Sequence, residues 1–312
     1  MKKIKIKNQP ETSTLESALE NFDNSCEVRG LSPRTIENYQ RVLDDFYHFL
    51  TSNSIIYLKD LDIQVLENYI KNLQDRKYKP TSINFYIRNV RVFLKWCEDR
   101  GLLPRIKLKE VKVDTPIKET YTQEELRVLL RKPTKTKTFL QLQTWAVENF
   151  LYATGARIGV LPALHIEDLD FQSNTITMMR TKNRKGMVVP MSNSLKKVLI
   201  EFLKTRKGEP KDFLFCNAYG GATSVRALQN AIYEYNLARN ITKTSAHLFR
   251  SSFAKAYILN GGNAFSLQKL LGHAHIATTQ IYVNMFNADL QQDYDKFNPL
   301  DNLSMRGEKI KI

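Results

Sequence analysis

Apolar residues recur at helical spacing through much of this chain, and this pattern constrains its fold more than any other feature. In residues 31–50, Ser32 is placed to cap a helix whose first position is Pro33. The apolar residues that follow lie three or four apart and form one face: Ile36, Tyr39, Leu43, Phe46 and Leu50. The same pattern over 14–30, 63–77 and 81–101 predicts a bundle of four helices with no strand in the first hundred residues.

The stretch 104–121 carries two prolines and five basic residues and has no helical period, so it is predicted to be an interdomain linker. Thr122, with Glu125 three residues later, forms a capping box that starts a helix. Residues 138–155 are apolar nearly all round, which predicts a buried helix ending at Gly155.

A β-hairpin is predicted next. Residues 174–179 alternate in polarity as a strand does, 180–186 form a polar turn, and 187–191 return. Two further helices are predicted over 194–208 and 224–240, with a short buried strand or turn at 212–217 between them. The predicted fold is therefore mainly α, with a small β-sheet in the C-terminal half.

The composition favours a polyanionic partner. The 312 residues suffice for about two domains, and 47 Lys and Arg against 32 Asp and Glu give a net charge of +15. A basic surface that is merely solvated is the alternative. Neither the N-terminal residues nor any later run resembles a signal peptide or a membrane span, which predicts a cytoplasmic protein.

Cysteine and histidine usage argues against a metal or disulfide framework. Cys26, Cys97 and Cys216 are odd in number and lack CxxC spacing, and the five histidines do not cluster at ligand spacing. The sequence therefore predicts no metal and no cofactor.

The residues that carry chemistry gather between Ser245 and Val283. His247 and Arg250 lie three apart, so on a helix both side chains share a face and can reach one small anion. Gly272 can end a helix, His273 follows it, and Tyr282 comes nine residues later.

This ordered set, an HxxR, an LGH and a tyrosine nine residues after that histidine, resembles the C-terminal signature of the tyrosine recombinase (phage integrase) family. The segment at Thr154, Gly155 and Arg157 is similar to the family's first arginine motif, although Val160 stands where the family usually has an acidic residue. The resemblance implies a catalytic lysine in the hairpin turn, at Lys182, with Lys185 as the second candidate.

The resemblance implies a set of catalytic roles. The two arginines neutralise charge on a scissile phosphodiester, the tyrosine attacks it, and one histidine accepts the phenol proton. The lysine protonates the departing 5′ oxygen, and the other histidine hydrogen-bonds the phosphate. The predicted catalytic residues are Arg157, Lys182, His247, Arg250, His273 and Tyr282.

The first hundred residues resemble the family's helical core-binding domain, through the S-P-x-T-x-x-x-Y opening at Ser32 and the T-S-I-N segment at Thr81. The candidate DNA contacts are Arg88, Arg91, Lys95 and Lys185, with a solvated face as the alternative for the first three. The predicted layout is a basic arm (1–11), a core-binding domain (12–103), a linker (104–121), a catalytic domain (122–286) and a tail (287–312) that docks on a neighbouring subunit in relatives.

The predicted function is a site-specific DNA recombinase that binds double-stranded DNA and forms a homo-tetramer on paired sites. Integration and excision of a mobile element is favoured over Xer-type resolution of replicon dimers, because Val160 and Ile166 depart from the housekeeping pattern. Two alternatives are a nicking and resealing activity like that of type IB topoisomerases, and a DNA-binding protein that has lost catalysis. The sequence does not identify accessory proteins or the DNA site.

Overall fold

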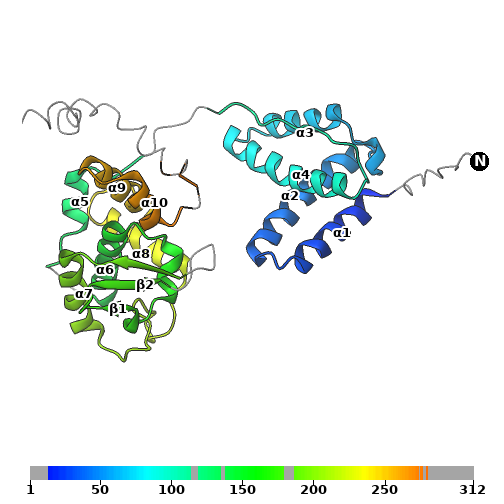
Figure 1. Ribbon diagram of the computed structural model, residues 1–312. Coiled ribbons are helices and arrows are strands. Elements are labelled where there is room, and N and C mark those ends of the chain that lie inside the picture. Colours follow the sequence, from blue (N-terminus) through cyan, green and yellow to red (C-terminus); the bar gives the residue numbers. More distant parts are fainter. Residues whose placement is uncertain are drawn as a thin grey trace, which may run out of the picture. The chain divides into compact units, whose positions relative to one another are not determined.

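The computed structural model describes residues 13–113, 119–134, 138–178, 186–273, 275–276 and 279. The chain divides into two compact units, Met1–Pro116 and Ile117–Ile312 (Figure 1). Described residues of the first unit form a bundle of α-helices, and those of the second combine helices with a small sheet. The predicted fold class is confirmed.

The first unit contains helices α1 (Leu15–Val28), α2 (Pro33–Ser52), α3 (Ile63–Asp75) and α4 (Pro80–Asp99), with a 3-10 turn η1 (Leu58–Asp60). The predicted cap of α2 is confirmed, because the Ser32 side chain accepts a hydrogen bond from the Thr35 amide. Aromatic side chains fill the core, and the rings of Phe22 and Phe93 meet edge to face with centroids 5.6 Å apart. Burial of these apolar faces is the main force that assembles the bundle.

The chain that follows α4 packs back onto that helix. Leu108 is 5% exposed. The Asn84 side chain donates to the Val111 carbonyl and accepts from the Val111 amide, both at 2.9 Å. Arg91 Nε donates to the Leu108 carbonyl at 2.6 Å. The first part of the predicted linker is therefore held on α4, a non-local contact that its irregular sequence does not reveal.

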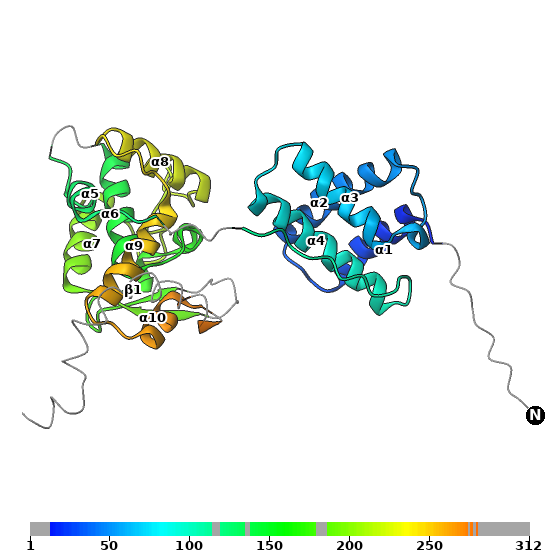
Figure 2. The same ribbon diagram turned by 90° about the horizontal axis from the view of Figure 1, so that it is seen from above.

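The second unit is built around α6 (Phe139–Thr154), which packs against α7 (Asn193–Arg206), α8 (Val225–Leu237) and α9 (Ala246–Leu259) (Figure 2). The predicted capping box of Thr122 and Glu125 opens α5 (Gln123–Leu129). Two 3-10 segments, η2 (Ile158–Ala163) and η3 (Ile166–Asp168), follow α6, and α10 (Ala264–Leu271) packs on α9. Most of α6 is buried, as its apolar sequence predicts.

The sheet has three antiparallel strands in the order β1 (Leu169–Asp170), β2 (Thr175–Met178) and β3 (Met187–Pro190). The predicted hairpin is β2 and β3, with Ile176 opposite Val189. Strand β1 was not predicted, because two residues are too few to show an alternating pattern.

The α6 residue Glu148 is a carboxylic acid enclosed in the core. Its side chain is 0% exposed, and neither carboxylate oxygen has a hydrogen-bond partner among the described residues. Burial raises the pKa of Glu148 well above its ordinary value, and nearby Arg239 offsets only part of this. Burial therefore favours the neutral, protonated form of Glu148 in the folded protein.

Glu148→Gln is expected to stabilise the protein at pH 8 by on the order of 1 kcal/mol. Above the ordinary carboxyl pKa the unfolded chain releases a proton that the folded chain retains, so the stability of the wild type falls as pH rises. The amide cannot ionise, and melting temperatures of the variant measured from pH 5 to 9 should show a flatter profile. Glu234→Gln, on the exposed side of α8, is the control. If the melting temperature of Glu148→Gln falls with pH as steeply as that of the wild type, Glu148 is not a buried acid with a raised pKa.

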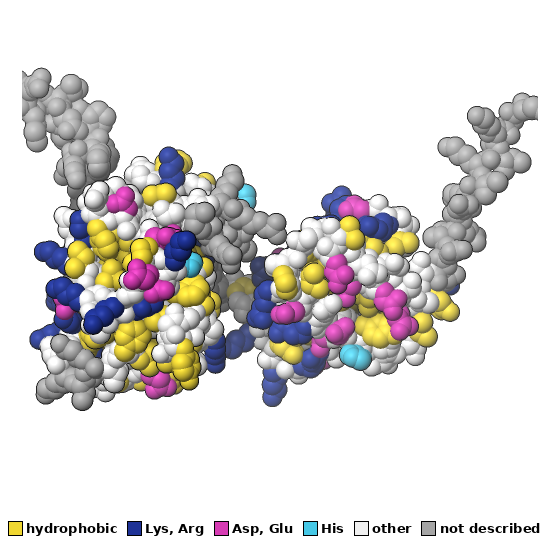
Figure 3. All heavy atoms as spheres, turned by 90° about the horizontal axis from the view of Figure 1, so that it is seen from below, with side chains coloured by type: hydrophobic (Ala, Val, Ile, Leu, Met, Phe, Trp, Pro, Cys, Tyr) yellow, Lys and Arg dark blue, Asp and Glu magenta, His cyan; other side chains and the backbone are white. Residues whose placement is uncertain are grey.

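Lysine and arginine side chains on the face shown in Figure 3 are interspersed with acidic and apolar ones over both units. The charge excess is therefore not gathered into a single patch on that face. Among the described residues, no helix is both long and apolar enough to cross a membrane.

Candidate active site

A left-handed glycine shapes the candidate site. Gly155 ends α6 at φ +63°, a region that residues with a Cβ rarely adopt. A Cβ at this position would also collide with the side chains of Phe253 and Leu271. The end of α6 can therefore lie directly against α9 and α10, and the chain turns there to place Arg157 immediately afterwards.

Arg250 is the centre of the contacts in this region. Its side chain comes from α9 and is 3% exposed. Nη1 donates to the Gly155 carbonyl at 2.7 Å, and Nη2 donates to the Leu271 carbonyl at 2.7 Å. Nη2 also lies 2.8 Å from His273 Nε2. Because a guanidinium keeps its charge in nearly any environment, these contacts fix one positive charge at the junction of α6, α9 and α10.

Arg157 comes to the same junction. Its Nη1 lies 3.5 Å from the Leu271 carbonyl, the atom that also accepts from Arg250. Its side chain is otherwise exposed, and no carboxylate of the described residues forms an ion pair with it. Val160, at the position that is usually acidic in the family, is 9% exposed and belongs to the core. Position 160 therefore offers no carboxylate to the Arg157 guanidinium, whose contact here is with the backbone carbonyl of Leu271.

His273 follows the left-handed Gly272, which ends α10 as the sequence predicts. Its Nδ1 lies 2.8 Å from Thr279 Oγ1. Since the guanidinium of Arg250 can only donate, His273 Nε2 accepts in this arrangement and Nδ1 carries the proton donated to Thr279. Gln268 Nε2 donates to the His273 carbonyl at 3.1 Å, which holds the backbone as well.

The structure thus brings together three of the predicted catalytic residues. Arg157 and Arg250 share the Leu271 carbonyl, and His273 contacts Arg250. His247 lies one turn before Arg250 in the first turn of α9 and its side chain is exposed. Lys182, Lys185 and Tyr282 lie outside the described residues, so their roles stay predictions.

Sequence reasoning missed three groups that orient this site. They are the backbone carbonyls of Gly155 and Leu271 and the buried hydroxyl of Thr279. A backbone carbonyl leaves no trace in a sequence. Thr279 is one of two adjacent threonines, and nothing in the pattern distinguishes it.

The candidate DNA contacts of α4 all have partners inside the first unit. Arg88 Nε donates to the Asn84 carbonyl, and Arg91 bonds the Leu108 carbonyl and pairs with Glu110. Lys95 pairs with two acids of its own helix, Glu98 and Asp99, and its side chain is 61% exposed. Of these three side chains, that of Arg91 binds two residues of the segment after α4, Leu108 and Glu110.

Residues 119–288 match the phage integrase family, and residues 18–103 match the phage integrase N-terminal SAM-like domain. The tyrosine recombinase XerD of Staphylococcus epidermidis is 26% identical over 295 residues, covering 91% of this chain and 99% of that protein. XerD of Staphylococcus aureus is equally similar, at 26% identity over 91% of this chain and 99% of that protein.

Solved structures with the same fold include the XerH site-specific recombinase bound to a palindromic difH substrate. Its TM-score is 0.71 at 20% identity, over 89% of this chain and 83% of that one. The integrase of the Tn1549 transposon in complex with transposon right end DNA has a TM-score of 0.69 at 16% identity, over 88% and 98% of the two chains. Both parts of the chain match, in order, the two parts of one family. The chain therefore belongs to the phage integrase family and is a tyrosine-type site-specific recombinase, an enzyme that cuts and rejoins DNA.

Proposed function

We propose that this recombinase integrates and excises a mobile element, using Tyr282 as nucleophile and Arg157, Lys182, His247, Arg250 and His273 as the other catalytic residues. The observation that supports this proposal best is the meeting of Arg157 and Arg250 at the carbonyl of Leu271, with His273 hydrogen-bonded to Arg250. A phosphodiester is a stable anion, so attack on it needs fixed positive charge next to its non-bridging oxygens. The convergence of two guanidinium groups from distant parts of the sequence supports a role in binding that phosphate.

The proposed reaction conserves the energy of the broken bond. The Tyr282 oxygen attacks phosphorus as its proton passes to His247, and a 3′-phosphotyrosine bond forms while the bond to the 5′ oxygen breaks. Lys182 gives a proton to the departing 5′ oxygen. A 5′ hydroxyl of another strand then attacks the phosphotyrosine and releases the tyrosine, so no ATP is consumed.

The proposed assembly on DNA is a homo-tetramer, because exchange of strands between two duplexes uses four nucleophiles. A lambda integrase, at 17% identity and a TM-score of 0.68, has been solved as a tetramer bound to a Holliday junction. We propose that residues 12–103 form the core-binding domain, which binds one side of a DNA half-site. We also propose that the tail, residues 287–312, docks on a neighbouring subunit.

The experiment that tests the function is the capture of covalent adducts on nicked duplexes that carry a randomised centre. The nick lets the short fragment that carries the released 5′ hydroxyl diffuse away, so the phosphotyrosine bond cannot be resealed. Sequencing the trapped DNA reports the target and the cleavage position together. Adducts that form in chelator and without ATP support the proposal, whereas cleavage that needs a divalent metal and leaves no adduct would sink it.

Xer-type resolution of replicon dimers is the second candidate, and the 26% identity to XerD proteins over 91% of the chain favours it. The sequences of the trapped DNA distinguish the two roles. Sequences from the ends of a mobile element support integration and excision, whereas a site in the host replicon supports dimer resolution. A topoisomerase-like activity would relax one duplex without joining two, so recombinant products from two labelled duplexes decide that point.

DNA binding is expected to weaken steeply with salt. A protein that neutralises six to ten phosphates loses roughly 10³- to 10⁵-fold in affinity between about 50 and 200 mM salt. Titrations of labelled duplex at four salt concentrations measure the slope. The slope is that of the logarithm of the binding constant against the logarithm of the salt concentration. Lys95→Gln should reduce its magnitude by about one if this exposed lysine contacts phosphate. A flat response of the wild type would contradict binding through the basic excess.

A further inference from the structure

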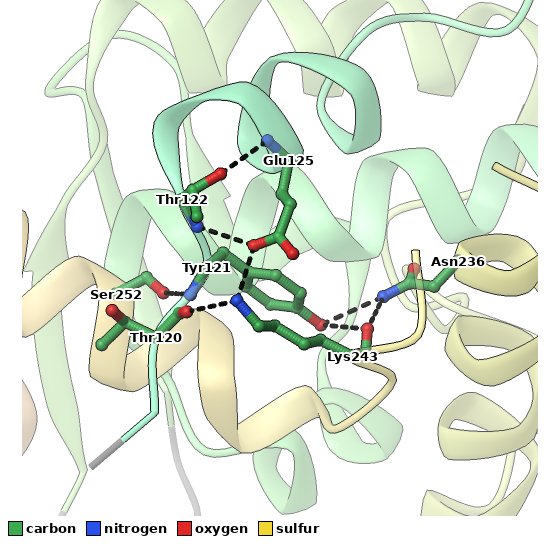
Figure 4. A network of polar contacts seen from close by, with 7 residues as sticks. All are labelled: Thr120, Tyr121, Thr122, Glu125, Asn236, Lys243 and Ser252. Carbon is green, nitrogen blue, oxygen red and sulfur yellow. Dashed lines mark hydrogen bonds and ion pairs between the residues drawn. The ribbon is translucent and has the colours of Figure 1, made fainter. Parts of the chain in front are cut away.

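The chain enters the second unit at Thr120 and Tyr121, and there it is bonded to α9 and to the loop before that helix (Figure 4). The Tyr121 amide donates to Ser252 Oγ at 2.8 Å. Lys243 Nζ donates to the Thr120 carbonyl at 3.1 Å and to Glu125 Oε2 at 2.9 Å. We call these five residues, Thr120, Tyr121, Glu125, Lys243 and Ser252, the α9 latch.

The latch is tightly built. Tyr121 is 4% exposed, and its ring packs against Phe249 with centroids 4.6 Å apart. Its hydroxyl donates to the Lys243 carbonyl and accepts from Asn236 Nδ2. The Lys243 and Glu125 side chains are only 22% and 24% exposed. An ion pair that is partly shielded and tied to backbone atoms holds its geometry better than an exposed pair.

The latch contacts α9 on the residues next to the catalytic ones. Phe249 and Ser252 share one face of the helix, and His247 and Arg250 share another face within the same turns. A shift of the latched face therefore moves the catalytic face with it. Since a misplacement of about 1 Å can lower a rate roughly 10²-fold, anything that fixes α9 along its axis bears on the reaction.

The other end of the same segment is also anchored. Asn84 holds both backbone groups of Val111 on α4, and Arg91 holds the carbonyl of Leu108. Residues 112–119 alone separate these anchors from Thr120. Within the second unit, the loop before the helix that carries His247 and Arg250 is bonded to Thr120, and the helix itself is bonded to Tyr121.

We propose that the α9 latch, and Lys243 and Tyr121 in particular, is a positioning element for DNA cleavage. It holds α9 at the axial position in which Arg250 and His247 can act on the phosphate. Lys243 does not itself touch the reacting atoms. It acts through α9, and the inference rests on the proposed function of that helix.

Lys243→Met removes both hydrogen bonds of Nζ and keeps the apolar stem. We expect a single-turnover cleavage rate about 10²-fold below wild type at saturating DNA, with the dissociation constant changed by less than about threefold. Lys243→Arg, which can still donate to Glu125 and Thr120, should recover most of the rate. Tyr121→Phe should lower the rate about 10-fold. Lys197→Met, an exposed lysine of α7, is the matched control for loss of one charge.

Amide hydrogen exchange of the free protein provides a readout that does not depend on cleavage. The amides of residues 247–252 should exchange faster in Lys243→Met and at the wild-type rate in Lys197→Met. A Lys243→Met protein that cleaves at the wild-type rate, or whose α9 exchange is unchanged, would overturn the latch. If wild type and Lys197→Met both fail to form an adduct, the proposed function fails, and the exchange comparison still decides whether Lys243 holds α9.

Discussion

Tyr282→Phe is expected to bind DNA as tightly as the wild type and to form no covalent adduct, a loss of at least about 10⁴-fold in cleavage. Only the phenol oxygen is removed, so shape and charge of the bound complex are retained. Phenylalanine has no oxygen that can attack phosphorus, and the covalent route is closed rather than slowed.

The measurement is a denaturing gel of protein cross-linked to a labelled nicked duplex, with affinity determined in parallel by a mobility shift. Tyr219→Phe is the matched control, because Tyr219 is 98% exposed and lies outside the predicted site. An adduct that survives in Tyr282→Phe would remove Tyr282 from its role and direct attention to another nucleophile.

Arg250→Lys is expected to lower the single-turnover cleavage rate by roughly 10²- to 10³-fold while changing the dissociation constant for DNA by less than about tenfold. A lysine keeps the positive charge but presents it at one point, whereas the guanidinium forks between the carbonyls of Gly155 and Leu271. The charge would then no longer be fixed at the position that the phosphate oxygens occupy.

This substitution should also reduce the free energy of unfolding by about 1–3 kcal/mol, since a buried carbonyl loses its donor. Arg206→Lys separates the two effects. Arg206 also donates to two backbone carbonyls, those of Lys207 and Phe213, but lies at the end of α7. A loss of stability without a loss of cleavage is expected for Arg206→Lys. Equal loss of cleavage in both variants would reduce Arg250 to a structural residue.

Local signals in the sequence predicted where most of the described elements begin and end. Ser32 before Pro33, the capping box of Thr122 and Glu125, and the glycines at 155 and 272 act on backbone groups within a few residues, so they can be identified without a fold. The same holds for the hairpin of β2 and β3, because residues 174–179 alternate in polarity and a polar turn follows them. The family resemblance rests on spacings that are equally local.

The tertiary structure alone decided which atoms meet. The hydrogen bond from Tyr121 to Ser252 spans 131 positions, and the bond from Arg250 to Gly155 spans 95. It also showed that Asn84 and Arg91 hold the chain after α4, and that Glu148 is enclosed in the core. Spacing along a helix determines which side chains share a face, but the partner of that face is set by packing between distant segments. For this reason the sequence by itself determined the elements and the residue types of the site, whereas the carbonyls that orient Arg250 and the latch that holds α9 appeared only in the folded chain.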